Sequence, residues 1–303
     1  MIDQDSLAAL DGLLWLRSGE AVAERLNLSQ PTVSRQARRC LQLFDIDVRK
    51  LDGEWDLIGD EPLLAAERRV HQEARWRGHR PLRLEATYWS GPMLCEPMPQ
   101  GWLLGLCNIV GVQRNLELVR QRVVDVWVAG LPDLPEPDDP ELTSITLSHM
   151  PVHCVVQPNH PLLRAKRLSF KDLRAYPSLG LPEGAYPKVE AALKAVGLWN
   201  SPVRMMRYDR RRWEGRTEQE LTIGYATCLS LEVSGGGMER LPLQLPFQSG
   251  EALVVRREFT TREPFLSLMQ LLMERLEILA ARHPEIRLSG SSGTEEAPLH
   301  PEP

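Results

Sequence analysis

The sequence predicts an α/β protein that begins with an all-α winged helix-turn-helix, and two patterns support this fold class. Before residue 45, apolar residues recur at helical spacing on either side of a short polar break, which indicates helices joined by a tight turn. From residue 82, short apolar strands alternate with helices, which is typical of a mostly parallel sheet with covering helices.

The first three helices are expected at residues 7–16, 20–26 and 30–44, where apolar residues follow a helical repeat. Ser29 can accept hydrogen bonds from the free N–H groups that begin the third helix. Pro31 stands in the first turn, where its missing N–H does no harm. The second and third helices therefore form the predicted helix-turn-helix.

A β-hairpin and a fourth helix are expected next. Residues 48–58 alternate apolar and polar residues around Asp52-Gly53, a dipeptide suited to a two-residue hairpin turn. Residues 60–78 begin with acids and a proline, carry arginines toward their end and stop at Gly78, as helices do. Pro81 then breaks the chain at a natural domain boundary.

The rest of the chain alternates between the two kinds of element. Strands are expected at 82–88, 101–110, 125–130, 153–157, 176–181, 203–208, 221–226 and 251–258. Helices are expected at 113–122, 186–197 and 264–282. The tail, residues 289–303, is rich in Gly, Ser, Pro and Glu without periodicity, so we expect it to be disordered.

Composition limits the function. The 303 residues suffice for two or three domains, and 43% hydrophobic with 25% charged residues is an ordinary globular balance. Because no apolar stretch is long enough for a membrane span and acids open the chain, we expect a cytoplasmic protein without a membrane partner. The net charge of −5 excludes coating of nucleic acid by bulk electrostatics but allows one local basic element.

Two segments carry a resemblance to a known family. Residues 21–40, AVAERLNLSQPTVSRQARRC, closely resemble the helix-turn-helix of LysR-type transcriptional regulators, whose second helix begins S-Q-P-[AST]-[VIL]-S-R-Q. Residues 155–184 resemble that family's crossing strand, P-x-H-P-L turn and S-x-x-D-L helix start. The resemblance covers roughly residues 3–288. It implies two effector-binding α/β lobes that are similar to a periplasmic binding protein.

The resemblance also implies a domain organisation. We expect residues 1–59 to bind DNA and residues 60–80 to form a dimerising linker helix, with Leu63, Leu64, Ala66, Val70 and Ala74 on its apolar face. Lobe I should comprise residues 81–151 plus 253–288, and lobe II residues 152–252, with crossing strands between them.

The chain departs from the family in two places that affect these expectations. Its wing carries Asp52, Glu54 and Asp56 where basic residues are common, so we expect few phosphate contacts and a shallow salt dependence of DNA binding. Its linker helix is shorter than usual and has a thin apolar face, so the dimer should be atypical.

The third helix is the candidate DNA-reading element. No acid occurs from Arg25 through Phe44, and side chains near the start of such a helix reach base edges in the major groove. We expect Gln30, Pro31, Ser34 and Arg35 to read sequence, and the remaining candidates to contact the backbone: Ser29, Thr32, Arg38, Arg39 and Lys50. The alternative is a solvated basic helix in a domain that only packs.

A small-molecule site is expected beyond the carboxyl ends of the strands, where helix N-termini present free N–H groups. In the resembled family, the turn after the first strand of the α/β domain supplies a hydroxyl, so Ser90 is the best candidate and Thr87 the next. Anionic ligands are favoured by these features. The other candidates are Tyr88, Trp89, Gly130, Leu131, Pro182 and Thr227. The alternative is that these turns serve backbone geometry alone.

Other chemistry is poorly supported. The chain has no G-x-S-x-G, no phosphate-binding glycine loop, no H-E-x-x-H and no metal spacing, so we expect no catalytic residue, metal or cofactor. Five unpaired cysteines without C-x-x-C indicate reduced thiols, and an oxidant-sensing pair of Cys95 and Cys107 is the weaker interpretation.

The sequence therefore predicts a transcriptional regulator, not an enzyme. Its expected partners are double-stranded DNA, a small-molecule effector, RNA polymerase, and further copies of the chain in a dimer or tetramer. Two alternatives stay open: a winged-helix regulator whose α/β domain serves assembly without a ligand, and an enzyme or solute-binding module.

Overall fold

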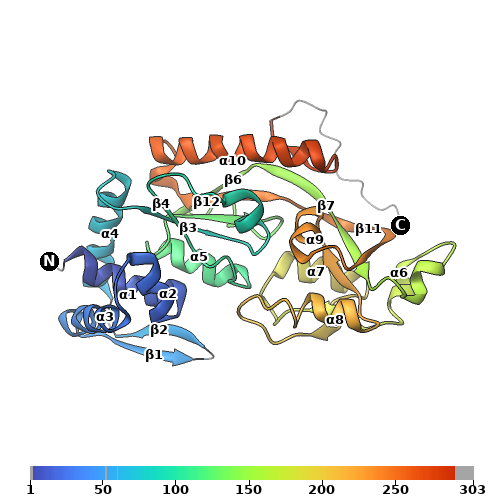
Figure 1. Cartoon of the computed structure of the whole chain (residues 1–303), viewed down its shortest axis with the longest axis horizontal. Helices are drawn as coiled ribbons and strands as arrows, with labels where there is room; N and C mark the ends of the chain where they lie inside the picture. Colours follow the sequence, from blue (N-terminus) through green and yellow to red (C-terminus); the bar gives the residue numbers. More distant parts are fainter. Residues whose placement is uncertain (1–2, 52, 60, 291–303) are drawn as a thin grey trace.

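The computed structural model describes residues 3–51, 53–59 and 61–290 (Figure 1). Asp52 of the predicted hairpin turn lies outside the described residues, as does the predicted disordered tail apart from Ser289 and Gly290. Across the described ranges, no helix combines the length and apolar content that crossing a membrane requires.

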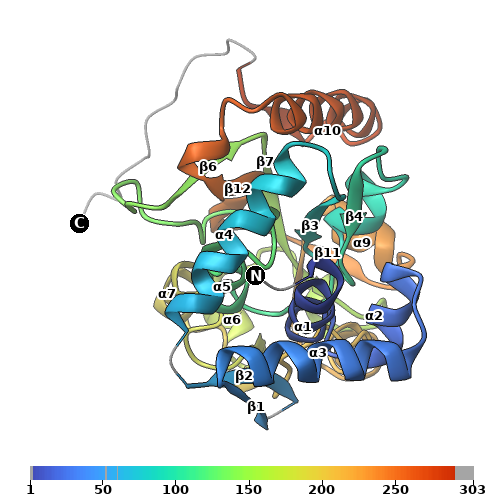
Figure 2. The ribbon, with the colours of Figure 1, turned by 90° about the vertical axis from the view of Figure 1, so that its left-hand side faces the viewer.

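The N-terminal domain has the predicted winged helix-turn-helix. Its elements are α1 (Gln4–Leu16), α2 (Gly19–Leu26), α3 (Gln30–Phe44), β1 (Asp47–Leu51) and β2 (Glu54–Ile58), with β1 antiparallel to β2. The predicted N-cap is present, because the Ser29 hydroxyl accepts a hydrogen bond from the Thr32 N–H. α4 (Pro62–Trp76) follows the wing (Figure 2).

Lobe I is built on a five-stranded sheet of order β4-β3-β5-β12-β6. The strands are β3 (Leu82–Ala86), β4 (Trp102–Leu104), β5 (Val126–Gly130), β6 (Leu142–Thr146) and β12 (Glu251–Arg256). α10 (Glu263–Arg282) packs on one face against Val126, Val128 and Leu253, while α5 (Val112–Arg120) packs on the other against Trp127 and Val254.

Lobe II lies beside lobe I and is built on β7 (Ser148–Val156), which pairs with β10 (Gly224–Ala226) on one side and β11 (Glu239–Ser249) on the other (Figure 1). Around this sheet lie α6 (Phe170–Leu173), α7 (Pro187–Ala195), α8 (Glu214–Gln219), α9 (Cys228–Ser234), β8 (Leu179–Gly180) and β9 (Ser201–Pro202). The three pairings of β7, with β10, β11 and β13 (Arg287–Leu288), are antiparallel, and so are both pairings of β12, whereas β3 pairs in parallel with β4 and β5. The expectation of a mostly parallel sheet is therefore wrong.

Two continuous segments cross between the lobes, β6 to β7 and β11 to β12. They run against each other at Leu147, whose N–H donates to the Glu251 carbonyl at 2.8 Å. A Cβ on Gly250 would lie 1.9 Å from the Ser148 carbonyl oxygen, so this crossing requires glycine. Because the chain passes from lobe I to lobe II along β6 and β7 and returns beside them along β11 and β12, these strands pair antiparallel.

Residues 203–208, predicted as a strand, do not form one. The strands β6 and β11 were not predicted. Residues 206 and 208 instead pair with the lobe I segment around Ile109: the Val110 N–H donates to Met206 and the Tyr208 N–H donates to Asn108. β11 contains prolines and shifts register twice along β7, which a sheet edge tolerates.

Candidate DNA-binding surface and interlobe pocket

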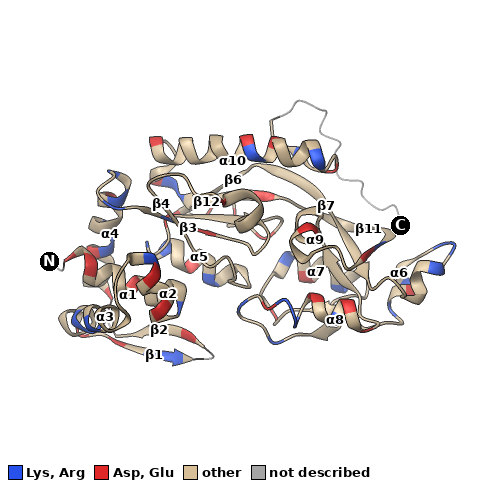
Figure 3. Cartoon of the chain, in the orientation of Figure 1, with Lys and Arg blue, Asp and Glu red and all other residues tan. Residues whose placement is uncertain are grey.

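The first part of α3 presents its polar residues to solvent. Val33, Ala37 and Cys40 are buried and fix the rotation of the helix. The exposed candidates are Ser29, Gln30, Pro31, Ser34, Arg35, Arg38 and Arg39, and Thr32 is half-buried. Figure 3 shows basic residues along α3 and β1. The candidate DNA-reading residues therefore share one accessible surface.

Local contacts order part of this surface. The Ser29 and Thr32 hydroxyls are 2.9 Å apart, and Arg35 donates to the Thr32 hydroxyl at 3.3 Å. Arg39 pairs with Asp3 at 3.2 Å on an exposed surface, where such a pair is worth at most about 1 kcal/mol. A phosphate can therefore compete for Arg39 at little cost.

The wing is less acidic toward solvent than its sequence suggests. Lys50 is exposed, with its Nζ 5.2 Å from the centre of the Trp55 ring. Glu54 is only 8% exposed and pairs with Arg17 of the same domain, so its charge is neutralised away from the surface. The expectation that Glu54 weakens phosphate contacts from the wing therefore loses its basis.

Buried polar contacts join the N-terminal domain to lobe I. Trp15 on α1 donates its indole N–H to Glu85 on β3 at 2.5 Å. Asp11, also on α1, accepts from Arg68 on α4 at 2.8 Å and from Arg83 on β3 at 3.2 Å. All five side chains are at least nine-tenths buried. The two domains therefore share one polar interface.

The wing contacts both lobes through arginines. Arg114 on α5 donates to the carbonyls of Leu14 and Trp55 and lies 3.7 Å from Glu54. Arg207 of lobe II lies 3.5 Å from the same Glu54 and donates to the Trp15 carbonyl at 3.3 Å. One carboxylate of the wing thus meets an arginine from each lobe.

α4 packs on its own chain along one face, which corrects part of the linker-helix expectation. Arg75 forms a two-pronged ion pair with Asp125 at 2.8 Å, and Trp76 stacks on Phe259 with ring centres 4.7 Å apart. Leu64, expected on the dimerising face, is fully buried within the chain, because it lies roughly 100° around the helix from the exposed Leu63. Leu63 and Val70 are 69% and 57% exposed.

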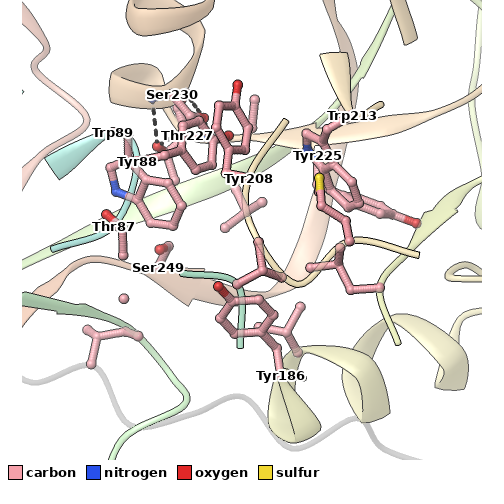
Figure 4. A pocket seen from close by; sticks show the side chains of 18 of the residues that line it. Thr87, Tyr88, Trp89, Tyr186, Tyr208, Trp213, Tyr225, Thr227, Ser230 and Ser249 are labelled. Atoms are coloured by element: carbon pink, nitrogen blue, oxygen red, sulfur yellow. Dashed lines mark hydrogen bonds between the residues drawn. The ribbon is translucent and has the colours of Figure 1, made fainter. Parts of the chain in front are cut away.

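A pocket lies between the two lobes (Figure 4). Its cavity volume is about 130 Å³. Lobe I contributes the end of β3, the segment at Ile109 and the end of β5, while lobe II contributes the rest. Six of the eight predicted effector residues line it: Thr87, Tyr88, Trp89, Gly130, Leu131 and Thr227.

Ser90 and Pro182 do not line this pocket, so their expected placement is wrong. Ser90 is fully buried, accepts from the Thr87 hydroxyl at 2.7 Å and donates to the Glu251 carboxylate at 3.3 Å. The backbone N–H groups of Gly91 and Met93 after it donate to carbonyls of the preceding turn. Pro182 instead begins a turn, accepting from the Ala185 N–H at 3.0 Å. The hydroxyl and free N–H groups expected to hold an anion are thus already used.

Sequence reasoning missed most of the lobe II wall. This wall is aromatic, and its main members are Tyr186, Trp199, Tyr208, Trp213, Tyr225 and Phe247. The chain has only five tyrosines and four of them line the pocket. That concentration was visible as a residue type in the sequence, but the spacing of these residues showed no common motif.

Two buried carboxyl groups lie close to the pocket without lining it. Burial raises the pKa of Glu251, against hydrogen bonds from Ser148, Trp89 and Ser90. Burial also raises the pKa of Glu214, against hydrogen bonding from the Tyr208 and Tyr88 hydroxyls. The charge of Arg210 also acts against the raised pKa of Glu214.

The cysteines offer no activated thiol among the described residues. All five are buried, and burial raises the pKa of Cys95 and Cys107. This environment favours the interpretation of both as inert core thiols.

The fold of the chain is similar to that of several solved bacterial regulators. A full-length OxyR variant from Pseudomonas aeruginosa is 16% identical with a TM-score of 0.55, over 91% of this chain and 94% of that one. A probable transcriptional regulator from the same organism is 16% identical with a TM-score of 0.56, over 90% of this chain and 97% of that one. CbnR in complex with its target DNA is 16% identical with a TM-score of 0.52, over 90% of this chain and 99% of that one. No curated protein sequence matches the chain.

The chain combines a winged helix-turn-helix with a two-lobed α/β domain and a pocket between the lobes. Residues 109–207 match the family model of the LysR substrate binding domain. This match lies in the part of the chain that includes one of the two sequence segments that resemble the LysR-type regulators, and the fold of the full chain is similar to that of solved regulators.

Proposed function

We propose that the chain is a sequence-specific DNA-binding transcriptional regulator whose DNA binding is tuned by a small molecule in the interlobe pocket. The exposed face of α3 carries the DNA-binding part of this proposal. Gln30, Pro31, Ser34 and Arg35 read base edges, while the backbone contacts come from Ser29, Thr32, Arg38, Arg39 and Lys50. Binding of DNA implies a cytoplasmic location.

The contacts at Arg207 support a route from the pocket to the DNA-binding domain. Met205 and Tyr208 line the pocket on either side of Arg207 in the chain, and Arg207 reaches Glu54 and the Trp15 carbonyl. Arg114 reaches the same Glu54 from lobe I. A ligand that changes the angle between the lobes therefore moves the two arginines relative to one another and alters how the wing is held.

Assembly through α4 supplies the second half-site. A single winged helix contacts one half-site, so productive binding calls for a two-fold pair. Leu63 and Val70 lie two turns apart on the exposed face of α4, and a second copy of this chain would cover both. We assign residues 1–59 to DNA binding, 60–80 to assembly, 81–151 plus 253–288 to lobe I and 152–252 to lobe II. RNA polymerase is the partner through which such a regulator acts.

A mobility-shift assay with random double-stranded DNA at low salt tests the proposed function. We expect the wild-type chain to bind and Arg38→Ala to bind all sequences more weakly. Absence of binding would contradict the proposal and favour an enzyme or solute-binding module. DNA binding without any ligand-dependent change in melting temperature would instead leave the α/β domain an assembly module.

A further inference from the structure

We propose that the interlobe pocket selects an uncharged, planar aromatic molecule, in place of the compact anion expected from the sequence. This inference rests on the proposed role of the pocket as the effector site and specifies the chemistry of its ligand. Three features of the pocket carry it: its aromatic walls, its size and a lining in which no described residue is charged.

Aromatic rings dominate the walls. Eight of the 21 lining residues are aromatic, whereas aromatic residues make up 6% of the chain. Tyr88 of lobe I stacks on Tyr208 of lobe II, with ring centres 3.6 Å apart and planes at 4°, and meets Trp89 edge to face at 4.9 Å. Trp199 packs beside Trp213 and Tyr225 at 6.4 and 5.9 Å. Flat rings prefer such stacked and edge-on neighbours.

The size of the pocket fits one or two fused rings. Its volume of about 130 Å³ is close to the roughly 150 Å³ of an apolar cavity that accepts benzene. Trp199 adds a directional contact, because its indole N–H is buried and has no acceptor among the described residues. A carbonyl or hydroxyl oxygen on the ligand would satisfy this donor.

Among the described residues that line the pocket, none is Lys, Arg, His, Asp or Glu. An anion that entered would lose its hydration without gaining a cation from the described lining. A cation would gain no carboxylate there, because neither Glu214 nor Glu251 lines the pocket and Glu251 is held by Trp89, Ser90 and Ser148. Burial raises the pKa of both acids, and at Glu214 it does so against the charge of Arg210. An uncharged ligand avoids both penalties.

Three probes of one shape and three charges test this inference: benzamide, benzoate and benzamidinium. In calorimetric titrations of the full chain at pH 7, we expect benzamide to bind at least tenfold more tightly than either ion. Tighter binding of benzoate or benzamidinium, or binding of none of the three at millimolar concentration, would overturn it. A parallel mobility shift reports the proposed DNA binding separately, so failure of the ligand class and failure of the function remain distinguishable.

A charge placed in the wall sharpens the test. Val189 lines the pocket from α7, so Val189→Arg should improve benzoate affinity at least tenfold over wild type and weaken benzamide. Ala195→Arg is the matched control, because Ala195 is exposed at the end of the same helix and does not line the pocket. Equal benzoate affinities for the two variants would contradict the assignment of this pocket as the binding site.

Discussion

Charged side chains are exposed on one surface of the N-terminal domain and buried in ion pairs on another. On α3, Arg35 and Arg38 point to solvent, and Arg39 makes only an exposed pair. On the surface formed by α1 and the wing, Asp11 and Glu54 are buried against arginines of α4 and both lobes. The first surface keeps its charges for an outside partner, whereas the second uses them to hold the domain in place.

The largest expected effect comes from breaking the buried surface. Asp11→Ala leaves Arg68 and Arg83 buried without their shared carboxylate, so the free energy of unfolding should fall by about 3–5 kcal/mol. Asp5→Ala on the same helix removes an exposed pair with Arg80 and should cost less than about 1 kcal/mol. Urea denaturation of both variants measures the difference. Equal losses would remove the distinction between the two surfaces.

The exposed stripe of α4 gives the next effect. Leu63→Glu together with Val70→Glu should convert the assembly to monomers while the fold persists, because both side chains face solvent in the single chain. Sedimentation velocity measures the oligomeric state and circular dichroism checks the fold. A double variant that keeps the wild-type sedimentation coefficient would remove α4 from the interface between copies.

A smaller effect is expected where the wing meets lobe II. Arg207→Met keeps much of the side chain's bulk but removes its contacts with Glu54 and the Trp15 carbonyl, at a cost of about 1–3 kcal/mol in domain docking. Hydrogen exchange should accelerate in α1 and β2 and stay unchanged in α10. Unchanged exchange in α1 and β2 would show that Arg207 does not hold the domain.

The two surfaces also differ in how well the sequence predicts them. The bounds of α3, 30–44, follow from a local repeat, the Ser29 cap and Pro31, so the helix that carries the candidate DNA-reading residues was predicted with its correct ends. The docking surface depends on partners far apart in the chain: Asp11 meets residues 57 and 72 positions away. Neither periodicity nor spacing identifies such pairs, so α4 was expected only as a dimerising linker helix, without its contacts to lobe I.

The pocket also has a part that the sequence predicts and a part that it does not. Thr87, Tyr88 and Trp89 were found because they end a strand, and strand ends are recognisable locally. The lobe II wall is assembled from separate loops and short strands, so no single segment of the sequence predicts it. Ser90 was misjudged because nothing local reveals that Glu251, 161 positions away, takes its hydroxyl.

The most direct measurement of the central claim is selection of bound sequences from a random DNA pool by the wild-type chain and by Arg35→Ala. The account predicts that the wild type enriches a motif with two related half-sites. Arg35→Ala should lose about 1–3 kcal/mol on that motif and its preference at one base position per half-site, because this side chain lies one turn into the exposed face of α3. Enrichment of the same motif with unchanged affinity by Arg35→Ala, or no enrichment by the wild type, would contradict the assignment of α3 as the reading helix.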